Sequence, residues 1–154
     1  MMPREIKIGN QYILYDVDRI ENIELFSFEP DYWIEHDALV GSEMGRGNTH
    51  IIQYHDIEYV LRHYQRGGQV ARLINDGYLW MGLSHTRAWK EWYLLADMRR
   101  KGLPVPRPVA ARVVRHGLYY RADIITERLM NAQTLAQYLN KGGLEKNEWA
   151  RLGN

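Results

Sequence analysis

The amino-acid sequence predicts an α+β fold, in which an antiparallel sheet of about five strands packs one face against one long helix. Segments rich in β-branched and aromatic residues follow one another in neighbouring pairs joined by short turns. A single long segment has the apolar spacing of a helix. Helices and strands do not alternate along the chain, which argues against a doubly wound parallel sheet.

Two hairpins account for most of the expected sheet. The turn residues His55-Asp56 and Arg115-His116-Gly117 each separate two β-rich segments. The four strands are expected at residues 49–54, 58–64, 109–114 and 118–125. A further strand is expected to lead into the glycine-rich turn at 41–48, whereas residues 1–40 are expected to be irregular. The aromatic cluster at 26–33 is expected to pack this terminal arm onto the core.

One long helix is expected to begin at Ser84 or Thr86, either of which can cap its N-terminus, and to run to about Lys101. Gly102, followed by Pro104, ends the helical pattern. Apolar residues at helical spacing form a stripe along one side of this helix: Ala88, Trp92, Leu95 and Met98. Shorter helices are expected at 133–140 and from about residue 146 onward.

The composition excludes several kinds of site. Apolar residues make up 45% of the chain and charged residues 25%, and no apolar run is long enough to span a bilayer. The absence of cysteine excludes disulfides, thiolate catalysis and cysteine-based zinc sites. The six histidines lack the spacing of metal ligands. A net charge of +1 gives no sign of a nucleic-acid partner.

Arginine dominates the positive charge, because five of the 20 basic residues are lysine and the other 15 are arginine. A guanidinium group offers a planar set of donors that can bind phosphate or carboxylate through two hydrogen bonds. An arginine-rich genome explains the same bias equally well.

Gly45-Arg46-Gly47 is the first candidate binding motif. A glycine turn between two strands can bring backbone N–H groups close to phosphate oxygens, because glycine has no side chain. The motif departs from the GxGxxG of protein kinases, since His50 stands where the third glycine belongs. No GKS or GKT follows it, as a P-loop would require. Taken alone, the motif favours an ordinary hairpin turn.

Arg62 and Glu91 are candidates for an ion pair. Strand alternation places Arg62 on the same face as Val60 and Tyr64. Glu91 lies on or beside the apolar stripe of the helix, where an unpaired charge is costly. A strand cation followed by a helix glutamate, here 29 residues later, resembles the pair that holds the nucleotide-gripping residue of kinases. An exposed arginine and a glutamate that faces water are the alternative.

The end of the last strand is a third candidate region. The segment Ile124-Ile-Thr126-Glu127-Arg-Leu129 leads from this strand into a short connector. In a kinase-like lobe the backbone at this position meets the adenine, so Glu127 and Leu129 are candidate cofactor-binding residues. The expected boundary divides the chain into a nucleotide-binding lobe, residues 1–130, and the beginning of a second lobe, residues 131–154.

Four segments carry a resemblance to a known family: Gly45–His50, Tyr59–Gly68, Glu91–Leu95 with Gly102–Val109, and Ala122–Glu127. They resemble the lipopolysaccharide kinase family, which shares the protein-kinase fold. The strings Leu-Arg-His-Tyr-x-Arg-Gly-Gly and Gly-Leu-Pro-Val-Pro are the most specific. The resemblance implies an enzyme that uses ATP and Mg²⁺ to phosphorylate a hydroxyl of 3-deoxy-D-manno-octulosonic acid (Kdo) in Kdo-lipid A. It also implies a peripheral location on the cytoplasmic side of the bacterial inner membrane.

The resemblance assigns roles to individual residues. Gly45, Arg46 and Gly47 would form the glycine loop, Arg62 would replace the strand lysine, and Glu91 would be the helix glutamate. Glu127 would begin the hinge. Arginine in place of lysine leaves open whether Arg62 or another cation holds the phosphates.

The sequence contains no catalytic residues of the expected kind. A kinase needs a catalytic aspartate, an asparagine and a metal-binding aspartate on a second lobe, and these are expected beyond Asn154. We therefore expect a truncated chain that does not transfer phosphate by itself. A lipopolysaccharide heptose kinase, a RIO-like protein kinase and a non-catalytic nucleotide-binding module are the alternatives.

Two surfaces are expected to meet partners. The apolar segment 78–81, with Arg66, Arg72 and Arg87, could touch a membrane interface or pack under the helix. A face that would meet the second lobe is expected to expose apolar residues and to favour self-association: Ile124, Leu129, Leu135, Tyr138 and Leu139.

Overall fold

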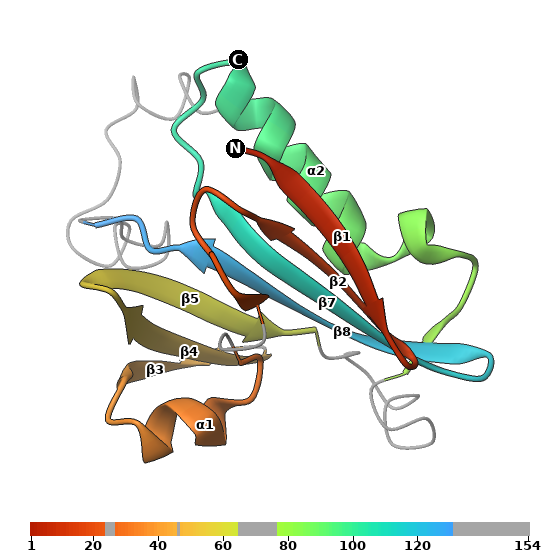
Figure 1. The fold of residues 1–154 in the computed structure, drawn as a ribbon, viewed down its shortest axis with the longest axis horizontal. Coiled ribbons are helices and arrows are strands. Elements are labelled where there is room, and N and C mark those ends of the chain that lie inside the picture. Colours follow the sequence, from red (N-terminus) through yellow and green to blue (C-terminus); the bar gives the residue numbers. More distant parts are fainter. Residues whose placement is uncertain (24–26, 46, 65–76, 131–154) are drawn as a thin grey trace, which may run out of the picture.

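The computed structural model describes residues 1–23, 27–45, 47–64 and 77–130. Within them, eight strands form one antiparallel sheet in the order β1-β2-β7-β8-β5-β4-β3, with β6 paired to β8 (Figure 1). The strands are β1 (Pro3–Ile8), β2 (Gln11–Asp16), β3 (Leu39–Gly45), β4 (Gly47–Tyr54), β5 (Ile57–His63), β6 (Tyr78–Leu79), β7 (Pro108–His116) and β8 (Tyr119–Glu127). The helices are α1 (Pro30–Glu35) and α2 (Arg87–Arg100), and a short 3-10 turn spans Leu83–His85.

The predicted fold class is confirmed, because an antiparallel sheet carries one long helix. The four strands expected from the two hairpins are present as β4, β5, β7 and β8. Their turns lie where expected: His55, Asp56 and Gly117 adopt positive φ angles of 48°, 60° and 61°. The expected number of about five strands is too low, since the described residues form eight. The expected helices at 133–140 and from about 146 lie outside the described residues.

The expectation that residues 1–40 are irregular is wrong. They contain β1, β2, α1 and the beginning of β3. β1 and β2 form a hairpin closed by Gly9-Asn10, in which Gly9 has a φ of 59°. A Gly-Asn pair between two alternating segments is a hairpin signal in the sequence. β1 itself is an edge strand with mostly exposed residues, so it carries little of the apolar pattern that marks a buried strand.

Helix α2 covers one face of the sheet. Figure 1 shows it running beside the part of the sheet that β1, β2, β7 and β8 form. Its buried residues Ala88, Trp89, Trp92 and Ala96 pack against Leu14, Ala111, Val113, Tyr120, Ala122 and Ile124. The predicted stripe is correct at Ala88 and Trp92, whereas Leu95 and Met98 are only half-buried. The helix starts after Thr86, as expected, but the Thr86 hydroxyl donates back to the Leu83 carbonyl rather than capping α2.

The opposite face is covered by the segment between β2 and β3, which includes α1. Four apolar side chains of this segment are buried: Ile20, Ile23, Phe28 and Trp33. They join a core cluster with residues of β2, β4, β5, β7 and β8. The expectation that an aromatic cluster packs the N-terminal arm onto the core is therefore confirmed for Phe28 and Trp33.

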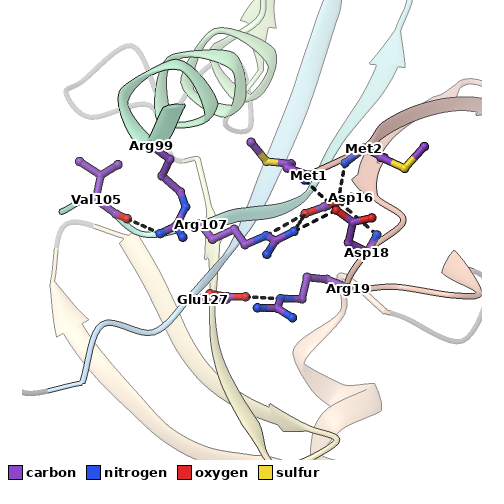
Figure 2. Close-up of polar contacts among 9 residues, drawn as sticks. All are labelled: Met1, Met2, Asp16, Asp18, Arg19, Arg99, Val105, Arg107 and Glu127. Carbon is purple, nitrogen blue, oxygen red and sulfur yellow. Dashed lines mark hydrogen bonds and ion pairs between the residues drawn. The ribbon is translucent and has the colours of Figure 1, made fainter. Parts of the chain in front are cut away.

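A buried charge fixes the end of β2 to the chain that leads into β7 (Figure 2). Asp16 is 0% exposed, and its Oδ2 accepts hydrogen bonds from Nε and Nη2 of Arg107 at 2.8 and 2.5 Å. Its Oδ1 accepts from the backbone N–H groups of Met2 and Asp18. A carboxylate can be buried only when a paired charge and hydrogen bonds compensate for its lost hydration. The pairing therefore holds the N-terminal hairpin against the connector after α2.

Replacing Asp16 by alanine is expected to destabilise the fold by about 3–5 kcal/mol, because the Arg107 guanidinium, itself mostly buried, loses its main partner. Asp18→Ala is the matched control, since Asp18 is 39% exposed and contacts the same guanidinium at 3.4 Å. Urea unfolding followed by tryptophan fluorescence measures both variants. An equal loss of unfolding free energy in the two variants would contradict this role of Asp16.

Candidate functional site

Arg62 and Glu91 meet between β5 and α2. Nη2 of Arg62 forms an ion pair with Oε1 of Glu91, and the Tyr64 hydroxyl donates to Oε2 at 2.5 Å. Arg62 also lies over the Tyr64 ring, 5.5 Å from its centroid. The predicted ion pair is therefore confirmed, and alternation along β5 places Arg62 and Tyr64 on the α2 side of the sheet, as expected.

Solvent exposure limits what this ion pair contributes to the stability of the fold. The side chains of Arg62 and Glu91 are 42% and 31% exposed, and pairs of that kind contribute about 0–1 kcal/mol to stability. Burial, followed by the hydrogen bond to Glu91, raises the pKa of Tyr64 well above its usual value. The phenol therefore remains a donor to Glu91 at neutral pH. The carboxylate is held from two sides, while part of the guanidinium remains open to solvent.

The glycine motif lies at the tip of the β3–β4 hairpin. Gly45 and Gly47 are partners in the register of β3 and β4, so these two strands meet at the glycines. Arg46 lies outside the described residues. Thr49, two residues after Gly47, is the partner of Arg62 in the register of β4 and β5. The hairpin tip and the Arg62–Glu91 pair therefore lie toward the same end of the sheet.

Glu127 is the last residue of β8, and its carboxylate is paired with Arg19. Its Oε1 accepts a hydrogen bond from Nε of Arg19 at 2.5 Å (Figure 2). Its backbone N–H donates to the Arg107 carbonyl at 2.9 Å. The next residue is also anchored, because Arg128 donates from its backbone to the Glu58 carbonyl and from Nη1 to the Glu58 carboxylate. Leu129 is 42% exposed. A ligand at this connector would therefore meet backbone and Leu129 rather than the Glu127 carboxylate.

Two residues of this region had no assigned role in the sequence-based prediction. Tyr64 follows Arg62 by two residues and so shares its face, a signal sufficient to include it. Arg19 belongs to the connection between β2 and α1, and no sequence pattern links it to Glu127, which is 108 residues away.

No three metal-ligating side chains among the described residues lie close enough together to hold an ion. For the phosphates of a nucleotide the residues fit better, because Arg62 presents an accessible guanidinium beside the hairpin tip.

In the segment 78–81, the two aromatic side chains pack against neighbours and the other two side chains are exposed. Trp80 stacks on Tyr12 with ring centroids 5.7 Å apart, and Arg87 lies 4.9 Å from the centre of the Tyr78 ring. Leu79 and Met81 are 59% and 70% exposed. Arg66 and Arg72, which were expected beside them, lie outside the described residues. No helix within the described ranges is long and apolar enough to cross a membrane.

The surface expected to meet a second lobe needs one correction. Ile124 is 1% exposed and packs in the core beneath α2, because its side chain points to the helix-covered face of β8. Leu129 is exposed as expected. The other expected members of that surface, Leu135, Tyr138 and Leu139, lie outside the described residues.

Comparison with known proteins places the chain among kinases of bacterial lipopolysaccharide. The family model described as "Lipopolysaccharide kinase (Kdo/WaaP) family" matches residues 30–154. The 3-deoxy-D-manno-octulosonic acid kinase of Vibrio vulnificus (strain CMCP6) is 40% identical over 152 residues, which cover 99% of this chain and 64% of that relative. The enzyme of the same name from Haemophilus influenzae (strain PittEE) is 38% identical over 155 residues, covering 97% and 64%.

The chain thus spans about 64% of the length of the curated relatives that it matches. No solved structure matches it. The family model covers well over half of the chain, and the identity to curated relatives extends over nearly all of it. The chain belongs to the lipopolysaccharide kinase (Kdo/WaaP) family.

Proposed function

We propose that this chain provides the nucleotide-binding lobe of a 3-deoxy-D-manno-octulosonic acid kinase, which transfers the γ-phosphate of ATP to a Kdo hydroxyl of Kdo-lipid A. The proposal rests mainly on the Arg62–Glu91 pair, which joins strand β5 to helix α2 beside a Gly-x-Gly hairpin tip. The relatives named as this kinase support the choice of substrate. In this proposal residues 1–130 form the lobe, and 131–154 begin the second one.

Three parts of the lobe are arranged in the order that a nucleotide requires. Glu127, where the hinge begins, is the register partner of Tyr59, and Arg62 follows Tyr59 by three residues. At the usual strand rise this separation is about 10 Å, a distance comparable to that between adenine and the phosphates. The hairpin tip at Gly45 and Gly47 lies beyond Arg62. We infer that the backbone after Glu127 binds adenine, while Arg62 and the glycine turn bind the phosphates.

Each residue has a defined task in this proposal. Arg62 positions the phosphates through its exposed guanidinium, and Glu91 with Tyr64 orients that guanidinium. ATP, with Mg²⁺, supplies the transferable phosphoryl group. The catalytic aspartate and the metal ligands are expected outside these 154 residues. A heptose kinase of the same family is the alternative, since the same lobe would serve another sugar acceptor.

The proposed acceptor implies a membrane location. Kdo-lipid A is an anionic glycolipid, so we propose a peripheral position on the cytoplasmic side of the inner membrane. The exposed side chains of Leu79 and Met81 could reach the interface.

Replacing Arg62 by alanine is expected to weaken ATP binding about tenfold or more, the usual effect of losing one charge-assisted contact. Glu91→Gln should weaken binding less, because Arg62 remains but is no longer oriented by a carboxylate. Arg100→Ala is the control, since Arg100 is 75% exposed and lies on the same helix. Isothermal titration calorimetry measures all three. Unchanged ATP affinity in Arg62→Ala would remove Arg62 from the site.

Arg19→Ala is expected to weaken ATP binding by about fivefold. The Arg19–Glu127 ion pair is partly exposed, and such a pair contributes at most roughly 1 kcal/mol, which corresponds to that change in affinity. Arg19→Lys, which retains the charge, should restore most of the affinity. The same titrations measure both variants. If the alanine variant binds ATP as the unmodified chain does, the Arg19–Glu127 pair does not position the hinge.

Phosphoryl transfer can be tested with a chimera that joins this chain to the part of the Vibrio vulnificus relative that it does not match. With γ-labelled ATP, the chimera should label Kdo-lipid A and this chain alone should not. The chimera with Arg62→Ala is the control for the nucleotide site. Label in the isolated chain would contradict the assignment of catalysis to other residues. If the chimera labels a heptose acceptor and not Kdo-lipid A, the alternative of a heptose kinase would be favoured.

A further inference from the structure

A pocket lies on the face of the sheet opposite Arg62. Its cavity has a volume of about 430 Å³, and its floor is made by β2, β4, β5, β7 and β8 with the start of α1 at its side. Strand alternation separates it from the nucleotide face, because Leu61 and His63 point away from Arg62.

The charged floor of this pocket is held by a fixed network. Asp123 is 2% exposed and lies between Arg112 and His63 in the sheet register. Its Oδ2 accepts from Nε of Arg112 at 2.7 Å, its Oδ1 is bonded to Nδ1 of His63 at 2.5 Å, and Arg112 also donates to Glu29 at 2.6 Å. Burial by itself lowers the pKa of the Arg112 guanidinium, but Asp123 and Glu29 raise it above its usual value. The carboxylates of the pocket thus already have cationic partners.

The groups left for a ligand include strong hydrogen-bond donors. Arg121 is exposed and makes no ion pair with any described residue, and it precedes Asp123 by two residues on the same face of β8. Nδ1 of His50 is buried and has no hydrogen-bond partner within the described part of the chain. A buried polar atom without a partner is costly and calls for a ligand or water. The Gln11 amide lines the same cavity, from β2.

We propose that this pocket binds a phosphate monoester carried on a sugar-sized ligand. A guanidinium, an imidazole and an amide reach the cavity from β8, β4 and β2, which suits an oxyanion whose acceptors point in several directions. The volume exceeds that of a phosphate group, and Phe28, Leu61 and Val114 offer apolar contacts for a sugar ring. The described histidines and carboxylates do not gather as a metal site. The proposal is independent of the nucleotide site.

Arg121 and His50 are the residues that carry the proposal, and glucose 6-phosphate is the probe that tests it. Calorimetric titration of the 154-residue chain should show saturable binding, whereas glucose should not bind. Arg121→Ala should weaken binding about tenfold and His50→Phe should also weaken it. Two control variants should bind the probe as the unmodified chain does. Arg4→Ala changes an exposed position of the edge strand β1, and Arg62→Ala changes the opposite face of the sheet.

Any of three results would overturn this inference. The first is no saturation by about 10 mM glucose 6-phosphate, and the second is a loss of probe affinity in Arg121→Ala no larger than in Arg4→Ala. The third is displacement of the probe by ATP together with a loss of probe affinity in Arg62→Ala. Circular dichroism of each variant confirms that the fold is retained. The source of the monoester is tested by competition with vesicles of phosphatidylcholine that contain or lack phosphatidic acid. Displacement only by phosphatidic acid supports the pocket with a lipid-borne ligand, and binding without such displacement supports it with a soluble sugar phosphate.

Discussion

The structure depends on the burial of β7 and β8 on both faces of the sheet. Val109, Ala110 and Ala111 are each fully buried, and Ile124 and Ile125 are buried on opposite sides of β8. A strand that is apolar on both sides needs a covering layer on each. Helix α2 supplies one layer, and the segment between β2 and β3 supplies the other. The remaining strands extend this central pair outward to the edges.

The same packing places the candidate nucleotide site. Trp89 and Trp92 are almost completely buried against the sheet, so the rotation of α2 about its axis is fixed by apolar contact. Glu91, between them in sequence, then lies at the side of the helix that reaches β5 and meets Arg62. The free energy that holds the helix comes mainly from the tryptophans, because an exposed ion pair contributes little. The ion pair is therefore not what holds α2 against the sheet.

Much of the central sheet, the long helix and the Arg62–Glu91 pair could be predicted because their signals are local. Alternation marks β5 and β8, helical spacing marks α2, and both partners of the ion pair follow from these elements. The N-terminal strands were missed because β1 is an exposed edge strand without a strong apolar pattern. The Arg19–Glu127 and Asp16–Arg107 pairs could not be predicted, since their partners are about 100 residues apart in sequence.

The family, the fold class and the order of glycine turn, strand arginine and helix glutamate could be read from the amino-acid sequence, because short segments with their own periodicity carry them. The tertiary structure sets which of the described charges are paired and which are not. It brings Asp123 between Arg112 and His63 and leaves Arg121 without a described ion-pair partner. The physical reason is that strand order in the sheet, β2-β7-β8-β5-β4, brings together residues from distant parts of the chain. That strand order results from burial of the whole core, so no single segment of the sequence reveals it.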